Sequence, residues 1–384
     1  MARTKSILFV SPAYHYSFTL RDQFRKMGWR ADVYVPPWYP EKLRYDKNAI
    51  GTHRAKLHKN HFVSYLQQSF YNHFFFLYLL TQYRYLVFYG GMDVLNLIED
   101  RIFQRLFRAD ISLSLEVAKI FQKKIIYFPS GCLDRETRAT FSQLDGGNVC
   151  KNCGWNDEIC NDERLKRRFA LHRRYGDLFI GGGNFDSTQL PETHLKFMSV
   201  DLNVFKPGIN IPHQFRLPRT RNLRIMHSFF DKNRTKNSKN IKGSSYVLEA
   251  SSRLKQEGLP VEYVYFSDIP LRHMRYYQVQ ADIVVDQLIY GWWGSTGVES
   301  MALGKPVVCY LRKEWKDFFY ETFPEYDSLP IVEATCENIY EVLKELVVNK
   351  EFREAKGKES RVFAERHFDV VKNAAELEKV FLNL

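Results

Sequence analysis

The sequence has no long apolar run. Its most apolar region, residues 62–80, is interrupted by polar side chains that include Gln67, Gln68, Asn72 and His73. A helix that crosses a membrane needs roughly 20 consecutive apolar residues, so none is expected. Residues 7–10 are too few for the apolar core of a signal peptide. We therefore expect a cytoplasmic protein that at most rests against the inner face of a membrane.

Two phosphate-binding signatures are also absent. Neither half of the 384-residue chain contains G-x-G-x-x-G or the phosphate-loop pattern G-x-x-x-x-G-K-[ST]. Both motifs use glycines to bring backbone N–H groups against phosphates, so their absence argues against a dinucleotide-dependent oxidoreductase and an ATPase. With 45% hydrophobic and 26% charged residues, the chain has the composition of a globular protein. Its length suits two domains.

Acidic residues are fewer than basic ones. The chain has 56 Lys and Arg residues against 44 Asp and Glu, a formal charge of +12. This charge suits anionic partners such as nucleotides, phospholipid headgroups or nucleic acid. Because the basic residues are scattered rather than gathered in one stripe, nucleic acid is an unfavoured partner. Residues 62–80 are either a buried helix or an aromatic face on an anionic membrane, with four basic residues near the headgroups: Arg54, Lys56, Lys59 and Arg84.

Segments typical of strands alternate with helical patterns, which predicts an α/β architecture with parallel sheets. Each half resembles its own doubly wound unit. Strands are expected at residues 7–10, 31–35, 85–89, 124–128, 177–180, 224–227, 261–266, 282–288 and 306–311. Helices are expected at residues 244–258, 271–280, 337–348, 350–367 and 370–382. Three prolines between residues 205 and 221 indicate that the domain linker lies there.

The most informative segment is residues 281–310, whose pattern is strand, glycine-bearing turn, short helix, tight turn and strand. Gly291, Gly294 and Gly297 remove side chains where backbone must approach a ligand. A helix is expected over residues 298–303, and its free N–H groups and dipole favour an anion. Glu299 is expected in the first turn, where its carboxylate either faces a ligand hydroxyl or faces solvent.

The C-terminal half resembles the glycosyltransferase group 1 family, the retaining, family-4-type enzymes that use sugar nucleotides. The resemblance lies in four consecutive stretches: residues 224–250, 253–265, 274–308 (ending GVESMALGKPVV) and 329–346. It implies a GT-B fold, in which two doubly wound, Rossmann-like domains face a cleft. Residues 1–212 would form the acceptor-side domain, with a cysteine-containing excursion near residues 132–162. Residues 213–368 would bind the sugar nucleotide, and residues 369–384 would form a helix that crosses back to the N-terminal domain.

The activity that this resemblance implies is that of a hexosyltransferase. It would move a sugar from a nucleotide-sugar donor to a saccharide, lipid-linked or glycoconjugate acceptor with retention of configuration, in polysaccharide biosynthesis. The family mechanism needs no catalytic cofactor, because the departing phosphate oxygen is thought to take the acceptor proton. The alternatives are an inactive protein that binds sugar nucleotides and a nucleic-acid-binding protein.

The resemblance also assigns roles to side chains. Arg234 and Lys242 would contact the donor diphosphate, where cations offset the developing negative charge. Lys242 is otherwise a solvated lysine, and Lys232, Lys236 and Lys239 are alternatives to Arg234. Glu299 matches the family's second glutamate, which binds the nucleotide ribose. The loop and helix start around it would bind the donor: Gly294, Ser295, Thr296, Gly297 and Val298.

The chain departs from the family pattern where the first glutamate is expected, because that position is Gly291. We look instead to the loop backbone, Trp292, Trp293 or Asp286 to hold the donor sugar. Asp286 is equally a strand-end residue that bonds a turn. In the N-terminal half, His15 follows the first strand and would contact donor phosphate or an acceptor hydroxyl. The alternative for His15 is a polar loop residue without a catalytic role.

A second motif involves cysteine. Cys150, Cys153 and Cys160 lie in one short polar segment, and Cys132 precedes it. Four thiolates would satisfy a tetrahedral, structural zinc ion, with His172 as a substitute ligand. Reduced thiols and an oxidised pair are the alternatives. Disulfides are disfavoured in a cytoplasmic protein.

Overall fold

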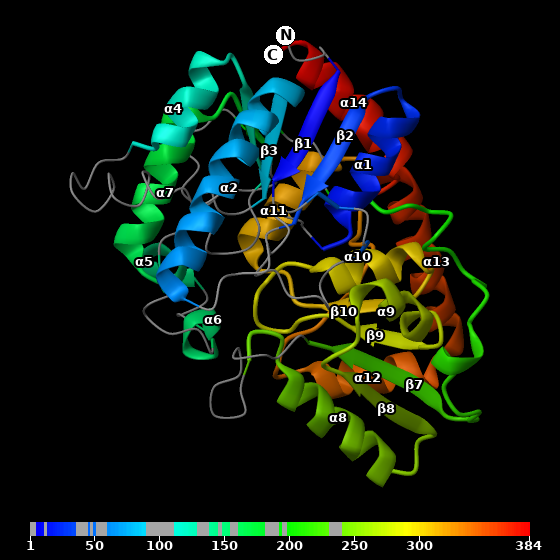
Figure 1. The fold of residues 1–384 in the computed structure, drawn as a ribbon. Helices are drawn as coiled ribbons and strands as arrows, with labels where there is room; N and C mark the ends of the chain where they lie inside the picture. The colour runs from blue at the N-terminus through cyan, green and yellow to red at the C-terminus, as the bar shows by residue number, and fades with distance from the viewer. Residues whose placement is uncertain are drawn as a thin grey trace. The chain divides into compact units, whose positions relative to one another are not determined.

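The protein is described by a computed structural model (Figure 1). The structure describes residues 5–10, 14–35, 45–46, 49–50, 60–89, 111–128, 138–144, 148–153, 160–180, 192–193, 198–229 and 240–384. The chain divides into two compact units. The first comprises Met1–Thr137, Asn161–Phe197 and Ala374–Leu384, and the second comprises Arg138–Cys160 and Met198–Asn373.

The first unit is built on a six-stranded sheet with the order β2-β1-β3-β4-β5-β6. All of its neighbouring strands are parallel. The strands are β1 (Ser6–Val10), β2 (Arg30–Tyr34), β3 (Tyr85–Tyr89), β4 (Lys124–Phe128), β5 (Leu178–Ile180) and β6 (Glu192–Thr193). Because both faces of a parallel sheet are covered by helices, its central strands are apolar at nearly every position. Every residue of β1 is buried accordingly.

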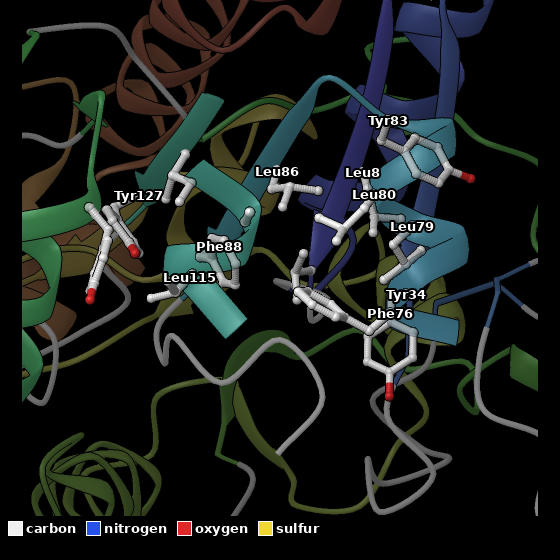
Figure 2. Packing of buried hydrophobic residues seen from close by; sticks show 14 of the residues in the cluster. Leu8, Tyr34, Phe76, Leu79, Leu80, Tyr83, Leu86, Phe88, Leu115 and Tyr127 are labelled. Carbon is white, nitrogen blue, oxygen red and sulfur yellow. The ribbon is translucent and has the colours of Figure 1, made fainter. Parts of the chain in front are cut away.

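Helices pack on both faces of this sheet. They are α1 (Tyr16–Lys26), α2 (His61–Gln82), α4 (Leu113–Ile120), α7 (Asp162–Tyr175) and α14 (Val370–Leu382). Figure 2 shows the core on one face, where Leu79 and Leu80 of α2 and Leu115 of α4 pack on alternate residues of the strands. On the other face, Phe381 of α14 stacks on Phe24 of α1 at 5.9 Å and on Tyr85 of β3 at 5.8 Å.

The second unit contains a five-stranded parallel sheet with the order β11-β10-β9-β7-β8. The strands are β7 (Leu223–Ser228), β8 (Val261–Phe266), β9 (Ile283–Val285), β10 (Val307–Cys309) and β11 (Val332–Glu333). The helices are α5 (Arg138–Phe141), α6 (Asn148–Lys151), α8 (Ser244–Gln256), α9 (Leu271–Gln278), α10 (Ser295–Ala302), α11 (Lys313–Thr322), α12 (Ile339–Val348) and α13 (Lys350–His367), with a 3-10 turn at His213–Phe215. Its main core joins α8 and α12 to the sheet.

The expected elements are present, but the informative segment differs in detail. The two strands that flank it, β9 and β10, have three residues each and are shorter than the sequence predicts. Helix α10 begins at Ser295, three residues before the predicted start. Glu299 therefore lies in the second turn, and its predicted place in the first turn is wrong. Because glycine is a poor helix former, the sequence did not indicate that Gly297 lies inside the helix.

Helix α2 is buried on one face only. Phe76, Leu79 and Leu80 are buried in the core, whereas other apolar residues are exposed: Leu66, Phe70, Phe74, Leu77 and Tyr78. The interpretation of residues 62–80 as a buried helix is therefore wrong for this outer face. Among the described residues, no helix is long and apolar enough to cross a membrane.

Candidate functional site

The candidate site lies at the carboxyl ends of β7 and β9 in the second unit, where α/β sheets bind their ligands. Three side chains meet here at the start of α10. The ammonium group of Lys242 donates to Asp286 Oδ1 at 2.8 Å and to Thr296 Oγ1 at 3.4 Å. The hydroxyl groups of Thr296 and Ser228 are 3.3 Å apart. The structure thus brings together three residues that the sequence predicts, Lys242, Asp286 and Thr296.

Asp286 follows β9 and is completely buried. Besides pairing with Lys242, it accepts a hydrogen bond at Oδ2 from the backbone N–H of Gly294. It therefore makes the turn contact that one of its two interpretations predicts. The carboxylate also lies against the N-terminus of α10, where the helix dipole favours negative charge. A Cβ atom at Gly297 would lie 2.8 Å from Oδ2, so the carboxylate fits only because position 297 is glycine.

Lys242 has a 14% exposed side chain and is not the solvated lysine of the alternative interpretation. Three polar side chains, those of Asn240, Ser244 and His227, hold the loop that carries Lys242. Asn240 Oδ1 accepts the backbone N–H of Lys242 at 3.0 Å, and Asn240 Nδ2 donates to Ser244 Oγ at 3.1 Å. Ser244 Oγ is in turn 2.8 Å from His227 Nε2. This chain of bonds fixes the Lys242 loop to the end of β7.

The tautomer of His227 follows from its partners. Nδ1 lies 2.9 Å from the carbonyl oxygen of Val285, which only accepts, so Nδ1 carries the hydrogen. Nε2 must then accept from the hydroxyl of Ser244. Burial, together with the nearby charge of Lys242, lowers the pKa of His227 to about 4. His227 is consequently neutral at pH 7 and serves as an uncharged support for the loop.

The loop between β9 and α10 has no room for a side chain at position 291. Gly291 has φ +87°, and a Cβ atom there would lie 2.5 Å from Nε of the buried Arg312. Arg312 donates through Nη2 to the carbonyl oxygen of Tyr290 and through its backbone N–H to that of Gly291. A guanidinium group, which the sequence did not point to, therefore occupies the space of the glutamate that the resemblance leads one to expect.

The two tryptophans of this loop have different surroundings. Trp293 is buried against Phe319 and Phe363 of the core. Trp292 is half-buried; its ring stacks on Trp293 at 4.1 Å and makes a tilted contact with Trp315 at 4.3 Å. Of the two, only Trp292 keeps exposed surface for contact with a ligand.

Glu299 is buried rather than solvent-facing, so the second of its two interpretations is wrong. Its carboxylate oxygen Oε2 accepts from Nε2 of Gln278, the last residue of α9, at 2.8 Å. Val298 is also buried, and its N–H donates to the carbonyl oxygen of Gly294. Val298 thus belongs to the core of the unit, whereas Ser295 and Thr296 are half-exposed at the helix start.

The other predicted residues lie apart from this cluster or outside the described ranges. Arg234 and its alternatives, Lys232, Lys236 and Lys239, fall outside the described residues. His15 belongs to the first unit, where it is buried at the N-terminal end of α1 and its carbonyl oxygen accepts from Thr19 Oγ1 at 2.9 Å. Its assigned role stays a prediction.

The zinc site also stays a prediction. Cys132 lies outside the described residues, whereas Cys150, Cys153 and Cys160 are half-buried. Within the described ranges, no three or more His, Cys, Asp or Glu side chains are grouped to hold a metal ion. His172, the substitute ligand, is buried in the first unit and stacks on Tyr127 at 4.2 Å. Burial lowers the pKa of His172 to about 3.

No protein-family description and no curated protein matches the chain. Three solved structures are similar to it over nearly its whole length. Sucrose-phosphate synthase from Thermosynechococcus elongatus has a TM-score of 0.59 at 13% identity and covers 98% of both chains. Anabaena HepE in complex with UDP and glucose has a TM-score of 0.60 at 12% identity and covers 100% of both chains. A glycosyltransferase from Rickettsia africae has a TM-score of 0.57 at 10% identity and covers 98% of this chain and 97% of that one.

The chain has the GT-B fold. At 10–13% identity these likenesses show the architecture of two α/β units with parallel sheets, as the sequence predicts, and nothing finer. In this fold, Lys242 and Asp286 pair at the carboxyl ends of the strands, where α/β proteins bind their ligands.

The first prediction concerns the space at position 291. Gly291→Ala should be more destabilising than Gly258→Ala, although both glycines have positive φ, +87° and +83°. Both variants carry the backbone penalty of about 1 kcal/mol, but only the first must also displace the buried Arg312. Urea unfolding followed by tryptophan fluorescence measures both. A Cβ atom at Gly258 meets nothing within 4 Å, so Gly258→Ala measures the backbone penalty alone. Equal losses of unfolding free energy in the two variants would show that Arg312 moves aside at no cost.

The second prediction concerns pH. The folded pKa of His227, about 4, lies below the unfolded value of 6.5, so the unfolded chain binds the proton first as pH falls. Titration of His227 leaves the free energy of unfolding unchanged above pH 6.5. Between pH 6.5 and 4 it lowers the free energy of unfolding by about 3 kcal/mol. His227→Asn should reduce this acid sensitivity in urea unfolding series, whereas His213→Asn, at an exposed position, should leave it intact. The same slope in both variants would contradict the assignment.

Proposed function

We propose that the protein is a glycosyltransferase that moves a sugar from a nucleotide-sugar donor to a saccharide, lipid-linked or glycoconjugate acceptor with retention of configuration. The observation that carries this proposal is the pairing of Lys242 with Asp286 at the N-terminus of α10. Support comes from the GT-B fold and from HepE, which was solved with UDP and with UDP-glucose. The pattern suits a ligand that carries phosphate at one end and hydroxyl groups at the other.

The proposed reaction breaks the bond between the anomeric carbon of the sugar and the diphosphate oxygen. The acceptor oxygen forms the new bond to that carbon, and its proton passes to the departing diphosphate. Lys242 stabilises the negative charge that develops on the diphosphate. The first-turn N–H groups of α10, which have no acceptors within the helix, add to this stabilisation. Asp286 orients the ammonium group and balances its charge before the donor arrives.

The nucleotide end of the donor is assigned to Glu299. A carboxylate accepts two hydrogen bonds from neighbouring hydroxyl groups, as ribose presents them. Glu299 lies one turn further along α10 than Thr296 and Ser295, so phosphate at the helix start and ribose at Glu299 follow the same helix. The sugar end is assigned to the loop of Gly291 and Trp292.

Turnover with sugar nucleotides tests the proposal. Purified protein should release a nucleoside diphosphate from at least one member of a panel of UDP-, GDP-, ADP- and TDP-sugars, offered with saccharide and lipid-linked acceptors. Lys242→Ala should lower kcat/KM about 10²- to 10³-fold, because the cation stabilises the leaving group. Lys344→Ala is the matched control. Lys344 of α12 also pairs with a carboxylate, that of Glu257 at the C-terminal cap of α8, at 2.8 Å.

Three outcomes count against the proposal. Release of no nucleoside diphosphate from any donor would leave only the binding alternative, in which the chain holds sugar nucleotides without turnover. Equal effects of Lys242→Ala and Lys344→Ala would remove Lys242 from the mechanism. An inverted anomeric centre in the product, read by nuclear magnetic resonance, would overturn retention alone.

We further propose that the outer face of α2 rests on an anionic membrane, which would bring the enzyme to lipid-linked acceptors. The exposed residues Leu66, Phe70, Phe74 and Leu77 recur every three or four positions and form one apolar stripe along the helix. All 22 residues of α2 lack Asp, Glu, Lys and Arg. Arg30 donates to the hydroxyl of Tyr78 at 2.9 Å beside this stripe. Aromatic residues, basic neighbours and a net charge of +12 suit an anionic surface.

Vesicle sedimentation tests this contact. The protein should sediment with vesicles that contain phosphatidylglycerol and less with pure phosphatidylcholine vesicles. Replacing Phe70 and Phe74, which are 67% and 59% exposed, by Ser should weaken sedimentation about tenfold or more, because two large apolar groups no longer leave water. Val348→Ser is the control, because Val348 ends α12 and is 61% exposed. Self-association through the same two phenylalanines without vesicle binding would contradict the membrane assignment.

A further inference from the structure

Gln278 is a buried polar side chain that the proposed reaction does not use. It ends α9 and has no exposed surface. Its amide nitrogen donates to Glu299 Oε2 at 2.8 Å. Its amide oxygen, also buried, has no hydrogen-bond partner among the described residues. An unpaired buried carbonyl oxygen costs folding free energy, so stability alone does not explain a glutamine here.

The surroundings of Gln278 would suit an apolar residue. Met274 lies one turn earlier on the same face of α9 and packs with Met226, Ala281 and Val284. An apolar side chain at position 278 would extend this packing and leave no unpaired oxygen. The feature that an apolar side chain could not supply is the hydrogen bond to Glu299.

We propose that Gln278 is a positioning residue that holds the carboxylate of Glu299 ready for the hydroxyl groups of a nucleotide ribose. This inference rests on the proposed function. A glutamate side chain has three rotatable bonds, and fixing it before the ligand arrives reduces the entropy lost on binding. The amide of Gln278 donates to Oε2 of the carboxylate and so helps to set the orientation of the group.

Binding of ribose and deoxyribose nucleotides tests the inference. Calorimetry with UDP, GDP, ADP and CDP first identifies the nucleotide that binds the full chain best. Its 2′-deoxy and 3′-deoxy analogues are then compared in Gln278→Met, which keeps the length and removes the amide. The ribonucleotide should bind about tenfold more weakly, since the Glu299 side chain must then be ordered when the ligand binds. An analogue that lacks the contacted hydroxyl should change less than about twofold, so discrimination against it collapses.

A double variant shows whether Gln278 acts through Glu299. In the Glu299→Ala background, Gln278→Met should cause no further loss of ribonucleotide affinity, because no carboxylate remains to be held. Ser300→Ala is the control, since Ser300 is equally buried beside Glu299 and its hydroxyl has no partner among the described residues. Its affinities should match the unaltered chain. If Gln278→Met fails to fold, Gln278→Asn, whose amide is too short to reach Glu299, should give the same pattern.

The outcomes separate the inference from the function on which it rests. Equal loss for ribonucleotide and deoxy analogues, or a further loss in the Glu299→Ala background, would overturn the positioning role while nucleotide binding stands. Unchanged affinities in Gln278→Met would do the same. If the unaltered chain binds none of the four nucleotides, the proposed function and the inference both fail.

Discussion

The ion pair between Lys242 and Asp286 is the interaction on which the candidate site depends. Asp286 is completely buried, and a buried carboxylate without partners is strongly destabilising. Here it has the ammonium group of Lys242, the N–H of Gly294 and the positive end of α10. Each neighbour is constrained in turn. Position 297 must be glycine to leave room for the carboxylate, and the Lys242 loop must be held within reach of it.

The same pair would also determine how the anion of the proposed function binds. An ammonium group has three donors, and the contacts described here direct two of them to Asp286 and Thr296. The loop cannot withdraw from Asp286 without breaking the bonds that link Asn240, Ser244 and His227. A neutral His227 adds no positive charge that would compete with Lys242 for Asp286. The site is therefore built before a ligand arrives, which avoids the cost of ordering it during binding.

The sequence predicts the parts of this structure that depend on local pattern. Apolar runs place the strands, and the glycines of residues 281–310 identify the turn before α10. It misplaces the start of α10, because the N-cap residue Gly294 is held by the carboxylate of Asp286, which lies eight residues earlier and reaches it only in the folded chain. The support of Glu299 by Gln278 and the filling of the space at Gly291 by Arg312 are likewise contacts over 21 residues in sequence. Helix α2 carries large apolar residues on its exposed face as well as on its buried face, so its sequence did not show which face is buried.

The loop from β9 to α10 explains how a site without the expected glutamate remains well defined. Arg312 holds the carbonyl oxygens of Tyr290 and Gly291, and Trp293 is anchored in the aromatic core. Gln287 donates to the carbonyl oxygen of Trp292. Since both sides of Trp292 are fixed, the backbone of this turn is a rigid surface. A rigid backbone recognises a ligand by shape and by the direction of its N–H and C=O groups, whereas a carboxylate recognises it by charge. Under the proposed function, glycine at position 291 would therefore make the sugar end of the site selective by shape rather than by charge, while Lys242 would serve the phosphate end.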